Sequence, residues 1–160
     1  ADLTVPAYIP EGYVPAAEQR MDLYRRIAAL RTPADEADLM DELLDRYGDV
    51  PKPVTALLNV AMLRAAAMET GITDITQKGR QLIFSFDMRI EPAALLAVCG
   101  MAGYRDRLQL AAGASPKLTL FLQPREDALD AAGGLVEQLR LQQNELQLQG
   151  QQPQEGGNEP

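Results

Sequence analysis

The chain has no histidine, no tryptophan and only one cysteine among its 160 residues. Histidine is the side chain that most often serves as a general base or a metal ligand, so its absence argues against most metal-dependent enzymes. A single cysteine, Cys99, excludes an intrachain disulfide framework and a zinc site made of several cysteines. We expect Cys99 to pack as a small hydrophobic side chain rather than to act as a nucleophile.

Basic residues are scarce: there are 15 against 23 acidic ones, and the formal net charge is −8. Binding to a phosphate backbone needs several converging lysines or arginines, so we expect no direct contact with nucleic acid. The longest mainly apolar run, residues 54–68, is interrupted by Asn59 and Arg64 and is too short to cross a bilayer. The first residues also lack the basic start and apolar centre of a signal peptide. We therefore expect a cytoplasmic protein that contacts no membrane.

Hydrophobic residues make up 46% of the chain and charged residues 24%, which is typical of a soluble globular protein. The length fits one domain. Three prolines in the first fifteen residues predict an extended N-terminal arm over 1–14. A single α+β domain is expected over 15–142, and the glutamine-rich segment 143–160 is expected to be a disordered tail.

The first half of the chain has the hydrophobic spacing of three helices, over 15–31, 33–47 and 51–70. Thr32 followed by Pro33 predicts the start of the second helix, and Gly48 predicts a left-handed cap at its end. The first helix has one stripe that contains Met21 and Tyr24 and an adjacent apolar stripe of Leu23, Ile27 and Leu30. In the second helix, Met40, Leu43, Leu44 and Tyr47 are expected to face the core.

After Gly71 the hydrophobic spacing changes to the alternation of β-strands. Two hairpins are expected, the first from strands 72–77 and 81–87 and the second from strands 105–110 and 117–123. A short helix over 92–99 separates them, and a last helix runs from about 125 past 142. Its Gly133-Gly134 pair costs about 1 kcal/mol per glycine relative to alanine, which suggests a kink or close packing. The predicted fold class is therefore α+β: an N-terminal three-helix segment followed by two β-hairpins in an antiparallel sheet, interleaved with helices.

Motifs that would carry enzymatic chemistry are missing from the sequence. There is no phosphate-binding loop G-x-x-x-x-G-K-[ST], no dinucleotide-binding G-x-G-x-x-G and no hydrolase G-x-S-x-G. The only serines, Ser85 and Ser115, have no histidine to activate them. We therefore expect no catalytic residues, and no cofactor or metal site, in this chain.

Acidic residues concentrate in one segment. Residues 33–50 hold seven acids and one base, Arg46, and so account for −6 of the net charge. Four of the acids repeat at helical spacing on one face: Asp38, Asp41, Glu42 and Asp45. Such a stripe is compatible with a solvated face, with a surface that binds a basic partner, or with a metal site if other segments supply ligands. The arginines of the preceding helix could also pair with it.

Two sequence runs point to a known family. The first is Y-I-P-x-x-Y-V-P at 8–15, followed by L-Y-R-R-I-A at 23–28. The second is E-L-L-D-R-Y-G-D-V-P at 42–51, followed by Val54 and Leu57-Leu58. Together these runs resemble the C-terminal domain of bacterial transcription-repair coupling factors. The resemblance is strong over residues 1–75 and looser to about residue 140.

The resemblance implies a role in DNA repair. Whole proteins of this family are translocases on double-stranded DNA whose motor uses ATP and magnesium. They displace stalled RNA polymerase and recruit UvrA for nucleotide excision repair. The C-terminal domain is implied to be non-catalytic and autoinhibitory, packing on a UvrB-like module and covering the surface that binds UvrA. By position in the second run, the implied interdomain contacts are Glu42, Asp45 and Arg46, and we add their neighbours Asp38 and Asp41.

Two other functions stay open from the residues alone. The first is a stand-alone acidic domain that binds a metal such as Mg²⁺ or another ligand through the stripe. The second is direct contact with DNA through the arginines of the first helix, which are Arg20, Arg25, Arg26 and Arg31.

Overall fold

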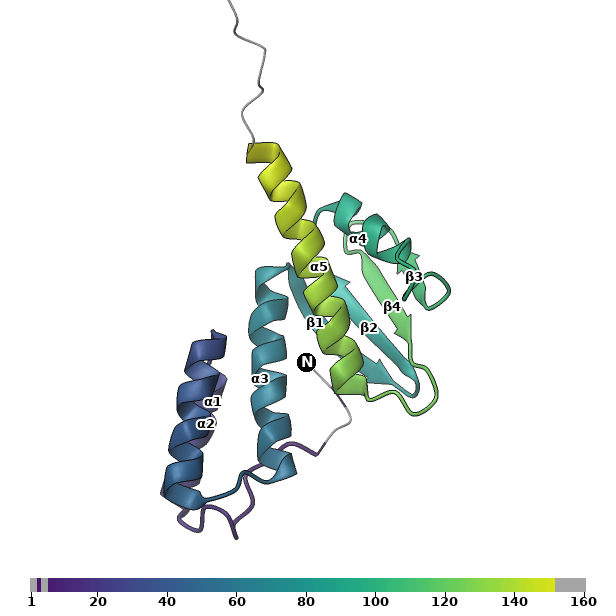
Figure 1. The fold of residues 1–160 in the computed structure, drawn as a ribbon. Coiled ribbons are helices and arrows are strands. Elements are labelled where there is room, and N and C mark those ends of the chain that lie inside the picture. The colour runs from purple at the N-terminus through teal and green to yellow at the C-terminus, as the bar shows by residue number, and fades with distance from the viewer. Residues whose placement is uncertain (1–2, 4–5, 152–160) are drawn as a thin grey trace, which may run out of the picture.

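The computed structural model describes residue 3 and residues 6–151, which form five helices and one four-stranded sheet (Figure 1). In chain order the elements are α1 (Ala17–Ala28), α2 (Pro33–Tyr47), α3 (Lys52–Glu69), β1 (Ile72–Lys78), β2 (Gln81–Phe86), α4 (Pro92–Cys99), β3 (Leu108–Ala111), β4 (Lys117–Phe121) and α5 (Ala128–Gln151). The predicted α+β class, with three helices before two hairpins, is confirmed.

The sheet is antiparallel throughout, in the order β1-β2-β4-β3. Both predicted hairpins form, and they join where β2 pairs with β4. Helix α5 crosses one face of the sheet (Figure 1). Helix α3 lies alongside α5 near β1, and α4 lies near β3. Leu82, Phe84 and Leu120 point to this face and are fully buried, because alternate residues of a strand face the same side.

The two hydrophobic clusters of the described residues share α3. Leu63 and Ala67, in the second half of α3, pack with the sheet, α4 and α5; we call this cluster the sheet core. Val54, Leu58 and Ala61, in the first half, pack with the arm, α1 and α2; we call this the helical cluster. Burial on both sides explains why α3 carries apolar residues over a wide arc.

In α1 only the second of the two predicted stripes is buried, and in α2 the buried face differs from the predicted one. Leu23 and Ile27 are the buried residues of α1, whereas Met21 and Tyr24 are exposed. In α2 the structure buries Leu39 and Leu43; Met40 and Tyr47 are half-buried, and Leu44 is exposed. Each helix offers two adjacent apolar stripes, and contacts with α3 select between them.

The N-terminal arm is anchored by hydrogen bonds from its main chain. The Tyr8 N–H donates to the Pro53 carbonyl at 3.2 Å, and the Ile9 N–H donates to the Tyr24 hydroxyl at 2.8 Å. The side chains of Ile9 and Val14 are buried in the helical cluster. The arm residues 6–10 have no regular secondary structure, and residues 11–13 form a turn.

Helix α5 continues well past the boundary that we placed at residue 142, so the first part of the segment expected to be a disordered tail is helical. The reason is a tertiary contact. Gln143 is buried, its side-chain amide donates to the Arg89 carbonyl at 2.8 Å, and its side-chain oxygen accepts from the Glu91 N–H at 3.1 Å. Leu146 packs against the sheet core one turn later. The rest of the tail, 152–160, lies outside the described residues.

Within residues 3 and 6–151, no helix is both long enough and apolar enough to cross a membrane.

Candidate functional site

The acidic stripe lies on the exposed face of α2. The helix begins with a capping box, in which the Thr32 hydroxyl accepts from the Asp35 N–H at 3.1 Å and the Asp35 carboxylate accepts from the Thr32 N–H at 3.2 Å. Three carboxylates then project from the face opposite the buried leucines, and they are those of Asp38, Asp41 and Asp45. Among the described residues none of these three has a hydrogen bond or an ion pair through its carboxylate.

Glu42, on the same face, is held from within the domain. Both guanidinium nitrogens Nη1 and Nη2 of Arg26 on α1 donate to its carboxylate, the second at 3.1 Å. Nη1 of Arg46 lies 3.6 Å from the same carboxylate, one helical turn away. The Arg26 hydrogen bond, with the charges of both arginines, lowers the pKa of Glu42 below its ordinary value. The first two helices therefore do form an ion pair with each other. Among the described residues of the stripe, Glu42 alone takes part in it.

Arg46 is about half exposed at the end of α2. Its guanidinium carbon lies 5.2 Å from the centre of the Tyr47 ring, a cation–π distance. The Tyr47 hydroxyl in turn donates to the Gln19 side-chain oxygen at 3.3 Å. Arg46 therefore presents a positive charge beside the acidic stripe while its position is restrained by Glu42 and Tyr47.

Tyr13 of the arm supports the end of α2. Its hydroxyl lies 3.0 Å from the Gly48 carbonyl and 3.3 Å from the Leu43 carbonyl. Its ring lies 5.6 Å from the Tyr47 ring. Burial, followed by the nearby Asp49 charge, raises the pKa of Tyr13. Gly48 ends the helix with a φ of +84° and a ψ of −160°, which favours glycine as predicted but is an extended rather than a left-handed helical conformation.

The sequence did not reveal two members of this site. Arg26 was one of several arginines on the first helix, and only the packing of α1 against α2 brings it to Glu42. Tyr13 belongs to the arm, and its contact with Gly48 joins residues that are 35 positions apart along the chain.

The four arginines of the predicted first helix, three on α1 and Arg31 in the turn after it, are mostly used within the domain. Arg20 donates to the carbonyls of Val14 and Pro15, and Arg31 donates to those of Ala28 and Leu30. With Arg26 bound to Glu42, only Arg25 of the four has no such partner in the described part of the chain. This arrangement gives no support to a DNA-binding surface on α1.

The described residues contain no cluster of three or more histidine, cysteine, aspartate or glutamate side chains that could hold a metal ion. The stripe therefore lacks the converging ligands that the metal hypothesis required. Cys99 is half-buried at the end of α4, and burial raises the pKa of its thiol, which disfavours the nucleophilic thiolate.

Comparisons with known proteins agree on one family. The model of the TRCF domain family matches residues 3–94. Curated proteins named transcription-repair-coupling factor are 43% identical over 75 residues in Mycobacterium tuberculosis and 31% identical over 99 residues in Escherichia coli. These alignments cover 47% and 61% of this chain but only 6% and 9% of the relatives. The matched part of the chain thus spans less than a tenth of the length of these relatives.

A solved structure has the same fold. The crystal structure of the C-terminal domain of a transcription-repair coupling factor superposes with a TM-score of 0.76, covering 90% of this chain and 92% of that one. The sequence identity is 20%, so the likeness shows a shared fold.

Proposed function

Because the chain belongs to the TRCF domain family of transcription-repair coupling factors, we propose that it is the regulatory, non-catalytic domain of such a protein. In this proposal the domain packs on the UvrB-like module of the same protein and covers the surface that UvrA would bind. It thereby helps to hold an ATP-driven DNA translocase in a resting state until RNA polymerase is engaged.

The observation that carries the proposal is the exposed acidic face of α2. Asp38, Asp41 and Asp45 lie on a rigid, capped helix, and no described residue neutralises them. Charged groups that are fixed in place and accessible suit a docking surface, where they set orientation and association rate. A basic surface on the partner would complement them.

Glu42 and Arg46 have a different part in the proposed interface. Glu42 is bound by Arg26 and Arg46, so it fixes α2 against α1 and positions the neighbouring acids. Arg46 is half exposed and contributes a positive charge beside Asp45. An interface with both signs of charge selects one orientation of the partner more strongly than a purely acidic one.

The regulatory mechanism would be a shift in population. The closed form hides the UvrA surface, and movement of the motor releases the domain. Moving such an equilibrium from 1:99 to 99:1 takes about 5.5 kcal/mol of differential binding, which a modest interface can supply. In this proposal ATP and magnesium serve the motor alone, and the whole protein acts in the cytoplasm on RNA polymerase and DNA.

The direct test is binding of this chain to the isolated UvrB-like module of its own coupling factor. The double variant Asp41→Lys/Asp45→Lys should weaken binding by roughly tenfold or more, since like charges would then face each other. The control Asp106→Lys/Glu145→Lys changes the net charge equally at exposed sites away from α2. Equal affinity for both double variants would show that α2 is not the docking face.

A second measurement addresses masking in the whole protein. The α2 charge reversal should raise the affinity of the resting protein for UvrA, because it weakens the closed form. Unchanged UvrA affinity, together with weakened docking of the isolated parts, would leave the interface in place but contradict its masking role.

A further inference from the structure

Strand β3 is an edge strand, and within residues 3 and 6–151 some of its main-chain groups have no hydrogen-bond partner. The Phe121 N–H donates to the Arg107 carbonyl at 2.9 Å, and β3 pairs with β4 in register Leu108↔Leu120 and Leu110↔Leu118. Because hydrogen-bonding sides alternate along an antiparallel strand, Gln109 faces β4 and both Leu108 and Leu110 direct their N–H and C=O groups outward. In the sheet formed by the described residues, β3 is the last strand and pairs with β4 alone.

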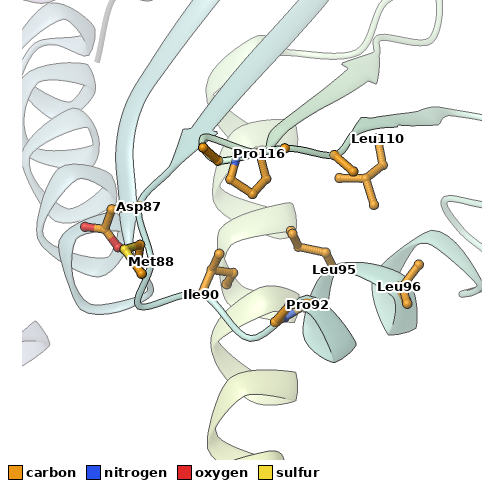
Figure 2. Close-up of a pocket in the computed structure, with 11 residues that line it drawn as sticks. Asp87, Met88, Ile90, Pro92, Leu95, Leu96, Leu110 and Pro116 are labelled. Atoms are coloured by element: carbon orange, nitrogen blue, oxygen red, sulfur yellow. The ribbon is translucent and has the colours of Figure 1, made fainter.

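An apolar groove adjoins this edge. It lies between the start of α4, the loop after β2 and the tip of the β3–β4 hairpin, and has a volume of about 540 Å³. Figure 2 shows Leu95 and Leu96 of α4 on one side and Leu110 and Pro116 on the other. Leu96 is 64% exposed, and Met88 at the groove's end is 95% exposed. Of the described residues that line the groove, Asp87 alone is charged, and its carboxylate forms an ion pair with Arg89.

One bound strand would both pair with the main chain of β3 and place side chains in the apolar groove. Leu108 and Leu110 lie on the same sheet face as α4, since they pair with the buried Leu120 and Leu118. A strand added to β3 would therefore direct every second side chain towards α4 and over Leu96. Natural edge strands are usually protected by charged residues or proline, and Leu108–Ala111 has neither.

We propose that this edge and groove bind an extended segment of a partner protein that has aliphatic side chains at alternate positions and adds to the sheet as a fifth strand. The unpaired N–H and C=O groups select an extended chain rather than a helix, whose main chain is already hydrogen-bonded. The groove selects its aliphatic side chains. Residues 152–160 of this chain do not fit, because they contain no aliphatic side chain beyond proline. The proposal is independent of the acidic face of α2.

The test uses the 160-residue chain and the synthetic peptide Lys-Thr-Val-Thr-Leu-Thr-Val-Thr-Lys as probe. In the free chain the amides of Leu108 and Leu110 should exchange with solvent faster than that of Gln109, which donates to β4. Saturating peptide should slow the exchange of Leu108 and Leu110 at least about tenfold and shift the resonances of Leu95 and Leu96. A peptide with proline in place of its two valines and of the two threonines beside its leucine should not bind, because it loses the main-chain donors that would face β3 in either strand direction.

Variants of the chain distinguish binding in the groove from nonspecific hydrophobic binding. Leu96→Glu should weaken peptide binding roughly tenfold, since it removes apolar contact area from an exposed position without disturbing the core. The matched control is Leu148→Glu, at a leucine of α5 that is 62% exposed, and it should bind like the unmodified chain. Leu110→Pro removes one outward N–H and should also weaken binding.

Three results would overturn the proposal. One is binding that is equal for the Leu96→Glu and Leu148→Glu variants. Another is equal binding of the alternating and the proline peptides. The third is a dimeric chain in which Leu108 and Leu110 are already protected without peptide, since a second copy would then occupy the edge.

Discussion

The carboxylate of Glu42 gives the fold a local dependence on pH. Its pKa is lowered from 4.5, first by the hydrogen bond from Arg26 and then by the charges of Arg26 and Arg46. A carboxyl group whose pKa is lower in the folded state stabilises the fold above its unfolded pKa and loses that contribution as pH falls through the folded pKa. Glu42→Gln should therefore destabilise the chain at pH 7 and have a smaller effect at pH 3.

Urea unfolding at the two pH values measures this difference. The control is Glu145→Gln, which removes an exposed carboxylate of α5 that has no ion pair with a described residue; it should stay close to the unmodified chain at both values. A Glu42→Gln effect that is the same at pH 7 and pH 3 would contradict an electrostatic role for the pair.

Two glycines should respond in opposite ways to substitution by alanine. Gly133 lies inside α5, and a Cβ there would meet nothing within 4 Å. Gly133→Ala should raise the free energy of unfolding by about 1 kcal/mol, which is the helix-propensity difference. Gly71 has a φ of +83°, and its Cβ would lie 3.1 Å from the Ile90 main-chain nitrogen. Gly71→Ala should therefore lower the free energy of unfolding by more than about 1 kcal/mol.

Chemical denaturation of both variants measures these changes in the free energy of unfolding. Stabilisation by Gly71→Ala would mean that the turn into β1 relaxes freely, and destabilisation by Gly133→Ala would mean that α5 needs close packing there. The sequence alone left close packing at Gly133-Gly134 open. The structure shows only an ordinary contact, 3.5 Å from a Gly134 Cβ to the Tyr104 hydroxyl.

At the scale of elements, the sequence predicted hairpins and turns better than it predicted helix faces. The predicted limits of α4 match the observed ones, and β1 and β2 differ by a single residue each. Glycine and proline mark those limits through local conformation. The buried face of α2 depends instead on α1 and α3. Leu39 or Leu44 would each extend the stripe through Leu43, and only tertiary packing buries Leu39.

The candidate site was predictable to the same extent. That Asp38, Asp41 and Asp45 are exposed follows from helical spacing within fifteen residues. The pairing of Glu42 with Arg26 joins two helices and depends on the crossing of α1 and α2, so the sequence left such pairing open but could not identify the two residues that make it. Local periodicity therefore identified the charged face but not which of its charges are internally neutralised.

The contacts of Gln143 near the end of α5 also depend on tertiary packing, so local pattern did not predict them. They can be tested by substitution. Gln143→Leu would leave the Arg89 carbonyl and the Glu91 N–H without their present partner, at a cost of about 1–3 kcal/mol. Gln147→Leu, at an exposed position one turn on, should change stability little. Thermal unfolding of both variants makes the comparison. Equal melting temperatures would mean that the loop before α4 finds other partners.

At the scale of the whole molecule, α3 joins two clusters of unequal size. Among the described residues, the sheet core has 21 buried residues and the helical cluster has 10. Buried apolar area is the main favourable contribution to folding, so the helical cluster should be the less stable part. It carries the acidic face of α2, and its local stability therefore bears on the proposed interface.

Because the two clusters differ in size, we expect a core substitution in one to affect amide exchange differently from a core substitution in the other. Leu58→Ala in the helical cluster and Leu120→Ala in the sheet core both remove a fully buried leucine, at a cost of about 2–5 kcal/mol each. Leu58→Ala should speed amide exchange mainly in α1 and α2, because the sheet core retains α5 and half of α3. Leu120→Ala should speed exchange everywhere, since the helical cluster is too small to persist once α3 loses the sheet. Native-state hydrogen exchange resolved by residue measures both patterns. If the exchange rates rose uniformly along the chain in both variants, the domain would instead be a single cooperative unit in which α1 and α2 are as stable as the strands.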